Sequence, residues 1–238
     1  MITKVVVVLP AFNAENTLSP VVKGLRKTLP GAQIIGINDG SADGTGALLR
    51  SVCDRTIEYT VNRGKGQALR DGFAAAREAG CDAVLTIDSD GQHDPAFAPS
   101  LIAALENFHI AIGTRDLTLE HVPKHRRLAN FLSTSATRLV SGGAVRDSQS
   151  GYRAIRREVL DEVHAEGDRY EYETDFIIRA AHAGFTITNV PISTIYGPQS
   201  YFREFHDAMR VIGVLWAHRS GMFHKPTPRP ASPVRRGT

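Results

Sequence analysis

Short apolar runs alternate with segments of helical periodicity along the first half of the chain. The run Val5–Leu9, closed by Pro10, is typical of a strand buried on both faces. Similar runs predict further strands at Gln33–Ile37, Thr56–Val61, Ala83–Ile87 and Ile110–Gly113. Apolar spacing predicts helices between them at residues 16–29, around Ala47–Leu49, from Gly64–Gly66 to Ala79, and at Pro95–Asn107. Strand and helix in series predict an α/β fold, in which a mostly parallel central sheet carries helices on both faces.

The second half of the chain has a less regular pattern. Helices are predicted at 124–141 and Tyr172–Ala183, a turn at Gly142–Asp147, and strands at Ser150–Ala154 and Phe185–Val190. The first of these strands is expected at a sheet edge, and the second is expected to stop at Pro191. Residues 202–217 have the pattern of an amphipathic helix, and Pro, Arg and Ser dominate from Gly221 onward. We therefore expect a main domain at 1–200, a helix within 201–220 that packs on the core or on a membrane surface, and a disordered tail at 221–238.

The composition is that of a folded protein. Of the 238 residues, 42% are hydrophobic and 22% are charged, which excludes a wholly disordered or collagen-like chain. The longest apolar run, Val211–Trp216, is too short to span a membrane. The N-terminal segment lacks the pattern of a secretory signal, and Cys53 and Cys81 are too few for a disulfide framework or a zinc site. We therefore expect a cytoplasmic protein with reduced thiols.

The net charge of +3 is a property of the C-terminal tail. Four of the 28 Lys and Arg residues lie at 221–238, where there is no Asp or Glu, so the rest of the chain has 24 basic against 25 acidic residues. A protein that binds nucleic acid is expected to carry a basic face on its folded part. The charge distribution therefore predicts no nucleic-acid partner.

Two carboxylates follow the predicted strand Ala83–Ile87, in the segment Asp88–Ser89–Asp90–Gly91–Gln92–His93. Asp88 and Asp90 lie on the same side of the chain, and carboxylates so close repel each other unless a cation lies between them. Mg²⁺ and Mn²⁺ prefer carboxylate oxygens together with the phosphates of a substrate. The pattern predicts a divalent-metal site that grips a diphosphate. The alternative is a turn that uses Asp and Gly for its backbone angles.

Two further polar loops follow predicted strands. The segment Asn38–Asp39–Gly40–Ser41–Ala42–Asp43–Gly44–Thr45 offers an Asp that can accept from a nucleobase or ribose, or alternatively a helix cap by Ser41 or Asp43. In Asn62–Arg63–Gly64–Lys65–Gly66 the glycines allow close approach of the backbone, and the two cations suit phosphate. This loop lacks the third Gly of a dinucleotide motif and the ending of a P-loop, which disfavours hydride transfer and ATP hydrolysis.

Together these segments resemble, in order and spacing, the inverting family 2 glycosyltransferases of GT-A fold. The similarity covers about residues 4–200. It includes Leu9–Pro10–Ala11–Phe12–Asn13–Ala14–Glu15, the three loops above, Gly113–Thr114–Arg115 and Asp147–Ser148–Gln149–Ser150–Gly151–Tyr152–Arg153–Ala154. The Gln-His after the Asp-x-Asp is similar to the dolichol-phosphate mannose synthase branch. The resemblance implies a Rossmann-like sheet, a nucleotide-diphosphate sugar donor, Mg²⁺ or Mn²⁺ as cofactor, and inversion at the anomeric carbon.

The resemblance also implies roles for individual residues. The donor-binding set comprises Pro10, Phe12, Asn13, Glu15, Asn38, Asp39, Lys65, Asp88 and Ser89. The metal ligands would be Asp88, Asp90 and Gln92, and Arg115 would contact the diphosphate or an acceptor phosphate. Phe12 has core packing as its alternative, and Arg115 an ion pair with a structural carboxylate. Asn38 stands where the family usually has an acid, so the nucleotide stays open, and Arg203 is the cation nearest to Tyr196–Gly197, where relatives often carry a Lys.

The expected mechanism follows from the negative charge that develops on the leaving diphosphate. A metal held by Asp88, Asp90 and Gln92, with Arg115 and Lys65 nearby, would stabilise that charge. A phosphate acceptor is already an anion and needs no general base, whereas a hydroxyl acceptor needs a carboxylate to take its proton. Glu173 and Asp175 are the candidates for that base, and their alternative is a solvated helix first turn.

We therefore expect a hexosyltransferase that acts on a polyprenyl phosphate at the cytosolic membrane face, with GDP-mannose or a UDP-sugar as donor. The helix at 202–217 and the basic tail could contact anionic headgroups. Two alternatives stay open. One is the same fold with a soluble or protein hydroxyl acceptor, and the other is a protein that binds nucleotide sugars without turnover. The oligomeric state stays open as well.

Overall fold

A seven-stranded mixed sheet lies at the centre of the part of the chain that the structure describes. The structure is a computed structural model, and it describes residues 2–115, 145–169, 171–193, 214, 218 and 229–231. The strand order is β3-β2-β1-β4-β6-β5-β7. The strands are β1 (Val5–Ala11), β2 (Gln33–Asn38), β3 (Arg55–Glu58), β4 (Ala83–Thr86), β5 (Ile110–Arg115), β6 (Arg153–Arg156) and β7 (Ile187–Ile192). All neighbours pair in parallel except β6, which is antiparallel to β4 and β5.

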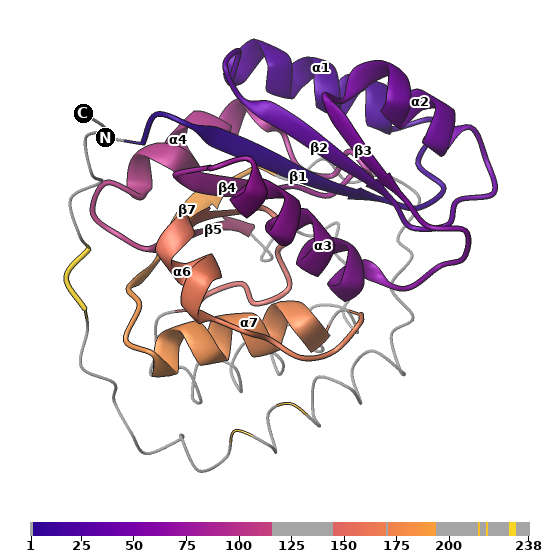
Figure 1. The fold of residues 1–238 in the computed structure, drawn as a ribbon. Helices are drawn as coiled ribbons and strands as arrows, with labels where there is room; N and C mark the ends of the chain where they lie inside the picture. The colour runs from indigo at the N-terminus through magenta and orange to yellow at the C-terminus, as the bar shows by residue number, and fades with distance from the viewer. Residues whose placement is uncertain are drawn as a thin grey trace, which may run out of the picture.

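Helices cover both faces of this sheet (Figure 1). They are α1 (Leu18–Thr28), α2 (Thr45–Val52), α3 (Lys65–Glu78), η1 (Pro95–Phe97), α4 (Ala98–Ala104), α6 (Arg157–Glu162) and α7 (Glu171–His182). Successive residues of β1 point to opposite faces, so Val6 and Val8 pack in the core under α3, α6 and α7, while Val7 and Leu9 pack under α1, α2 and α4. The predicted α/β fold is confirmed.

The sheet brings three polar loops together at the carboxyl ends of its parallel strands. Strand β1 pairs in parallel with β2 on one side and with β4 on the other. The segments that follow Ala11, Asn38 and Thr86 therefore leave the sheet at the same end, although they are up to 75 residues apart in sequence. Carboxyl ends of parallel strands are where ligands of such sheets bind.

Strand β6 corrects the expectation of an edge strand at Ser150–Ala154. It begins at Arg153 and lies between β4 and β5, with Leu85 opposite Ala154. Its two arginines are buried because their guanidinium groups donate to backbone carbonyls, those of Ser150 and Leu105 among them. A strand with two arginines has the sequence pattern of an exposed edge, and only tertiary contacts make it central.

Other elements also differ from the predictions. Strand β7 runs through Pro191 to Ile192, and because it is the last strand of the described sheet, the missing N–H of proline breaks no ladder on its free side. Strand β3 ends at Glu58 rather than Val61, and helix α6 was not predicted. Of the two expected caps for α2, Asp43 accepts from the N–H of Thr45 at 3.0 Å, whereas the Ser41 hydroxyl accepts from the N–H of Asn13.

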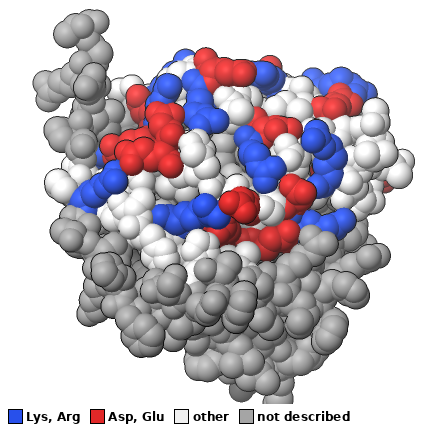
Figure 2. Space-filling view, turned by 60° about the horizontal axis from the view of Figure 1, so that its bottom comes forward, with Lys and Arg blue, Asp and Glu red and all other residues white. Residues whose placement is uncertain are grey.

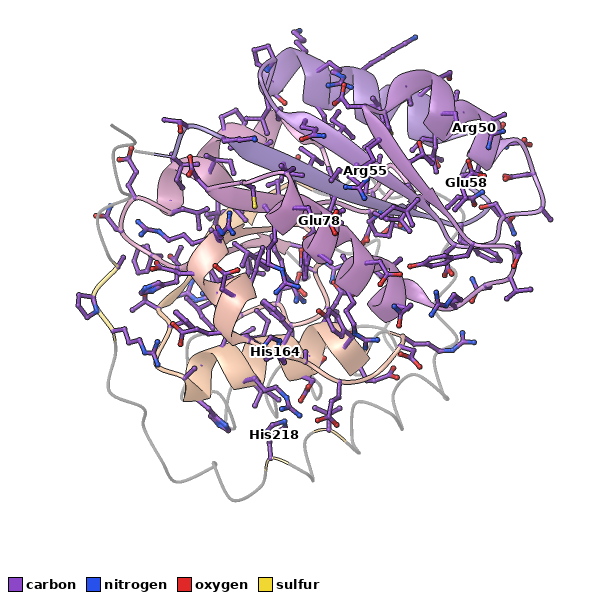
Figure 3. All side chains as sticks on the ribbon, in the orientation of Figure 1. Arg50, Arg55, Glu58, Glu78, His164 and His218 are labelled. Atoms are coloured by element: carbon purple, nitrogen blue, oxygen red, sulfur yellow. The ribbon has the colours of Figure 1, made fainter. Side chains whose placement is uncertain are left out.

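The edge strand β3 is bordered by ion pairs to the helices on both faces. Arg50 of α2 lies 2.5 Å from Glu58, and Arg55 lies 3.1 Å from Glu78 of α3, measured between the charged atoms (Figure 3). Such charges discourage the exposed edge from pairing with another sheet. Acidic and basic side chains are interspersed over the face that Figure 2 presents.

Several expectations fall on parts of the chain that the structure does not describe. The predicted helices at 124–141 and 202–217, the domain boundary at 200 and most of the tail lie outside the described residues. Within the tail, Arg229 is placed against the domain. Its N–H donates to the Gly184 carbonyl, its guanidinium lies 2.7 Å from Glu162, and it covers the ring of Phe185. In the described ranges, no helix is both long and apolar enough to cross a membrane.

His109, just before β5, predicts an acid-sensitive contribution to stability. Its Nδ1 accepts from the N–H of Thr186 at 3.0 Å, and burial lowers its pKa despite nearby Glu158. The unfolded state then binds more protons below about pH 6.5, so the stability that neutral His109 provides is lost as the pH falls from that value through the folded-state pKa. Urea unfolding measures the free energy of unfolding at pH 7.5 and at pH 5.5. The decrease between the two pH values should be smaller for His109→Asn than for the wild type. The exposed His164 (Figure 3) supplies the control, and an equal reduction in His164→Asn would contradict the assignment.

Candidate active site

Asp88 and Asp90 lie directly after β4, at the sheet edge where the three loops meet. Asp88 Oδ1 is 2.6 Å from the ammonium of Lys65, and Asp90 Oδ1 accepts from the N–H of Gln92 at 3.0 Å. Gly91 has a φ of +76°, so the segment also makes the turn that the sequence offered as an alternative. One oxygen of Asp90 shapes this turn, and the carboxylate is near enough to Asp88 for that charge to raise its pKa.

The two carboxylates of the site repel each other. Burial, together with the neighbouring Asp88, raises the pKa of Asp90 to about 6. Burial also opposes ionisation of Asp88, but the Lys65 ammonium holds the pKa of that carboxyl below its ordinary value. The pair therefore retains repulsion that a further cation would relieve.

Lys65 links this pair to helix α7. Its ammonium lies 2.9 Å from Glu173 Oε2 as well as 2.6 Å from Asp88. Arg153 adds a second positive charge, with Nη2 3.8 Å from Glu173 Oε1. Side chains from α3, α7, β6 and the segment after β4 thus form one partly buried charged cluster.

Gly151 leaves the space in which this cluster forms. A Cβ at this position would lie 2.5 Å from Asp88 Oδ2 and 2.7 Å from Lys65 Nζ. Position 151 therefore needs glycine because a side chain would not fit, and not because the backbone has an unusual φ angle.

Gly151→Ala is expected to separate Asp88 from Lys65 and to lower the rate of any reaction at this site by about tenfold or more, since small displacements of reacting groups are costly. The matched control is Gly31→Ala, because a Cβ there meets nothing within 4 Å. Turnover of both variants should be measured beside their melting temperatures. Equal activities in the two variants would contradict the role of the space at Gly151.

Arg115 is held by a buried carboxylate. Its Nε and Nη2 lie 2.7 and 3.0 Å from the two oxygens of Asp147, a bidentate pair. Burial opposes ionisation of Asp147, but the guanidinium holds the pKa of this carboxyl below its ordinary value. The structure therefore contains the ion pair that was the alternative for Arg115, and a role toward phosphate stays a prediction.

The loops at 12–15 and 38–44 are tied to each other by the side chains predicted to bind the nucleoside. Asn13, with a φ of +49°, accepts through Oδ1 from the N–H of Ala42, and Glu15 accepts from the N–H of Gly44 at 2.7 Å. Asn38 accepts from the N–H of Ser41 at 3.0 Å. Pro10 is buried in β1 and Phe12 is half-buried next to it. The structure brings these residues together, and their contacts to a nucleoside stay predictions.

Asp39 ties the loop at 38–44 to the glycine loop at 62–66, and the roles of both loops toward a donor stay predictions. Asp39 accepts from the N–H groups of Arg63 (2.6 Å) and Gly64 (3.0 Å), and burial raises its pKa against these bonds. The N–H of Gly66 donates to the Asp168 carbonyl, and a Cβ on Gly64 or Gly66 would collide with the Asp168 backbone. The close approach that these glycines permit is to another segment of the chain.

Glu173 and Asp175 do not share a site. Asp175 Oδ2 accepts from Arg179 Nε at 2.6 Å and from the N–H of Glu166, and its Oδ1 lies 2.7 Å from His218 Nε2 (Figure 3). Residues two apart on a helix point to nearly opposite sides, so only one of the two faces Lys65. The structure places Glu173 in the charged cluster and Asp175 in a separate ion-pair network.

Three residues of the site had no role in the sequence prediction. They are Asp147, Arg153 and His93. His93 is buried against the ring of Tyr152, its Nδ1 has no hydrogen-bond partner among the described residues, and burial lowers its pKa to about 4. The sequence signal for His93 was its place after Gln92, and the signal for Asp147 and Arg153 was their place in the matching segment Asp147–Ala154.

The donor set fits a hard divalent cation that a substrate completes. No group of three or more His, Cys, Asp or Glu side chains converges as a metal cage in the described part of the chain. Mg²⁺ and Mn²⁺ are commonly held by only one or two carboxylates together with substrate phosphates. Asp88 and Asp90 supply such carboxylates and repel each other.

Comparison with known proteins supports the same class. Residues 6–164 match the model of the family described as Glycosyl transferase family 2. The chain belongs to this family. It is therefore a glycosyltransferase, and the resemblance inferred from the motifs is confirmed, as is the predicted enzyme class.

Relatives and solved structures agree with this assignment. An uncharacterized protein of Methanocaldococcus jannaschii is 34% identical, with coverage of 84% of this chain and 85% of that protein. The polyprenol monophosphomannose synthase of Mycolicibacterium smegmatis is 30% identical, with coverage of 80% and 77%. The glucosyl-3-phosphoglycerate synthase of Mycobacterium tuberculosis, crystallised with Mn²⁺, UDP-glucose and phosphoglyceric acid, superimposes with a TM-score of 0.73 at 23% identity, covering 92% and 80%. At that identity the likeness shows the fold.

Proposed function

We propose that this glycosyltransferase moves a hexose from a nucleotide-diphosphate sugar to a polyprenyl phosphate, with Mg²⁺ or Mn²⁺ and with inversion at the anomeric carbon. The observation that carries the proposal is the pair Asp88 and Asp90 beside Lys65, at the carboxyl edge of the sheet and next to the loops at 12–15 and 38–44. The donor would be GDP-mannose or a UDP-sugar.

The charges of the cluster give each residue a task in this reaction. Asp88 and Asp90 would hold the cation, with Gln92 as a further ligand, and a bound divalent ion supplies Lewis-acid neutralisation of the leaving diphosphate. The guanidinium of Arg115, fixed by Asp147, would place a positive charge beside the phosphate oxygens. Asp39 and Asn38 would orient the nucleoside above loops that are already tied together.

The environment of Glu173 favours an anionic acceptor. Its carboxylate lies between the ammonium of Lys65 and the guanidinium of Arg153. Because each of its two oxygens already faces a cation, the carboxylate is poorly placed to take a proton from a hydroxyl nucleophile. A phosphate monoester attacks without losing a proton. The name of the mycobacterial relative, a polyprenol monophosphomannose synthase, supports the same acceptor class.

A screen of donors and acceptors tests the proposal. GDP-mannose, UDP-glucose and UDP-N-acetylglucosamine would each be incubated with Mn²⁺ and a detergent-solubilised polyprenyl phosphate, and the lipid product identified by mass spectrometry. We expect one donor to give a polyprenyl-phosphate hexose, with no product from the matched polyprenol that lacks phosphate. Transfer to the polyprenol, or to a soluble hydroxyl compound alone, would instead support the alternative acceptor class.

We further propose that the protein is cytoplasmic and binds the membrane surface peripherally, through its basic tail. Changing Lys225, Arg235 and Arg236 to Gln is expected to weaken binding to anionic vesicles by about 100-fold, since each basic residue near such a surface contributes about 1 kcal/mol. Co-sedimentation with vesicles that contain 30% phosphatidylglycerol, roughly the anionic fraction of a charged leaflet, measures this, with neutral vesicles as control. If the triple variant sediments like the wild type, the tail is not the membrane contact.

A further inference from the structure

Lys65 occupies an unusual position within the active site. Its ammonium lies within 3 Å of two carboxylates, Asp88 at 2.6 Å and Glu173 at 2.9 Å, and its side chain is 16% exposed. It is the first residue of α3, and the bonds from Gly64 to Asp39 and from Gly66 to Asp168 fix the start of that helix. A positive charge is therefore anchored on the same Asp88 that is proposed to hold the metal.

A divalent ion and an ammonium cannot both rest on Asp88 Oδ1, because like charges so close repel strongly. Lys65 must release that oxygen when a dication binds there, and it can keep Glu173 as its partner. Gly151 borders both groups, so the ammonium has no side chain of residue 151 in its way.

We infer that Lys65 is a resident counter-cation of the metal site, which neutralises Asp88 in the free enzyme and moves to Glu173 when the metal and the donor diphosphate bind. The inference rests on the proposed metal–diphosphate site. It adds that the affinity of this site for metal depends on the donor. Lys65 keeps the affinity for free metal low, so the negative charge of the donor is needed for tight metal binding.

The Asp88–Gln92 loop is also held by bonds that do not involve Lys65. The Thr17 hydroxyl donates to the Ser89 carbonyl at 2.7 Å, and Asp90 accepts from the N–H of Gln92. Neutral substitutions of Lys65 should therefore leave both carboxylates in place. A purely structural salt bridge predicts weaker or unchanged metal binding after its loss, whereas a counter-cation predicts tighter binding.

The test is a titration of the full chain with Mn²⁺, in which the free ion is followed by electron paramagnetic resonance, without donor or acceptor. Lys65→Met is expected to bind Mn²⁺ about tenfold more tightly than the wild type, and Lys65→Arg, which keeps the charge, within about threefold of it. Lys23→Met, at an exposed lysine of α1, is the matched control and should not change the affinity.

Lys65→Gln provides a second neutral variant should Lys65→Met fail to fold, which thermal unfolding would reveal. Neutral variants that bind Mn²⁺ no more tightly than the wild type would overturn the inference, and so would the absence of binding in every variant. The titration contains no sugar and no acceptor. Failure of the proposed transfer reaction would therefore appear in the product assay alone, and the two failures are distinguishable.

Discussion

Asp90→Asn is expected to lower kcat/KM for sugar transfer by about 10³-fold while making the protein more stable. The substitution keeps the shape of the side chain and its acceptor oxygen for the N–H of Gln92, but it removes one of the two charges that would hold the metal. Burial and Asp88 raise the pKa of Asp90 to about 6. At pH 7.5 the folded state must therefore ionise a carboxyl that ionises more easily when unfolded.

The sign of the stability change follows from this shift. A carboxyl whose pKa is raised on folding destabilises the folded state at a pH above both values, and a shift of about two units corresponds to roughly 3 kcal/mol at most. Because the ionisation of Asp90 is coupled to that of Asp88, we expect a gain of about 1 to 3 kcal/mol for Asp90→Asn without metal. Denaturant unfolding and initial rates on the same preparation measure the two effects.

Asp94→Asn is the matched control for this experiment. Asp94 lies in the same loop, and its carboxylate accepts from the N–H of Ala96 at the start of η1, a bond that asparagine can also accept. We expect nearly unchanged activity and stability. An Asp90→Asn enzyme with the wild-type rate would refute the role of Asp90 in holding the metal, and so would an Asp94→Asn enzyme that is equally inactive.

Arg153→Met is expected to produce the largest loss of stability. The buried guanidinium donates to three backbone carbonyls, those of Ser150 at 2.8 Å, Ser148 at 2.9 Å and Glu173 at 3.0 Å. Methionine fills much of the volume but leaves these carbonyls without the donor and Glu173 without one of its cations. Breaking a buried interaction of this kind costs about 3 to 5 kcal/mol.

For a chain of this length that loss corresponds to a fall in melting temperature of about 10 °C. Arg157→Met on α6 is the control, since the pair of Arg157 with Asp161 is exposed and contributes well under 1 kcal/mol. Calorimetry on both variants measures the difference. A melting temperature of Arg153→Met close to that of Arg157→Met would show that the three carbonyls find other donors or water.

The local pattern of the chain was enough for most of the fold. The run Val5–Leu9 is apolar at every position because its two faces lie in the two halves of the core, and the helical spacing of the flanking segments follows from covering those faces. Such patterns depend on neighbours in sequence and can be identified without coordinates. The central place of β6 could not be identified in this way. Its arginines are buried because they donate to carbonyls that lie more than 40 residues away or in the adjoining loop.

The candidate site divides in the same way. The chain itself determined that Asp88 and Asp90 follow a buried strand as neighbouring carboxylates, and that further polar loops follow other strands of a mostly parallel sheet. The strand order, which brings the ends of β2, β1 and β4 together, came from the tertiary structure. Only the tertiary structure decided that Lys65 lies on Asp88, that Asp147 holds Arg115, and that Glu173 faces the cluster while Asp175 turns to Arg179. The physical reason is that pairing of charges across distant elements depends on distances of a few ångströms, which residue spacing does not encode.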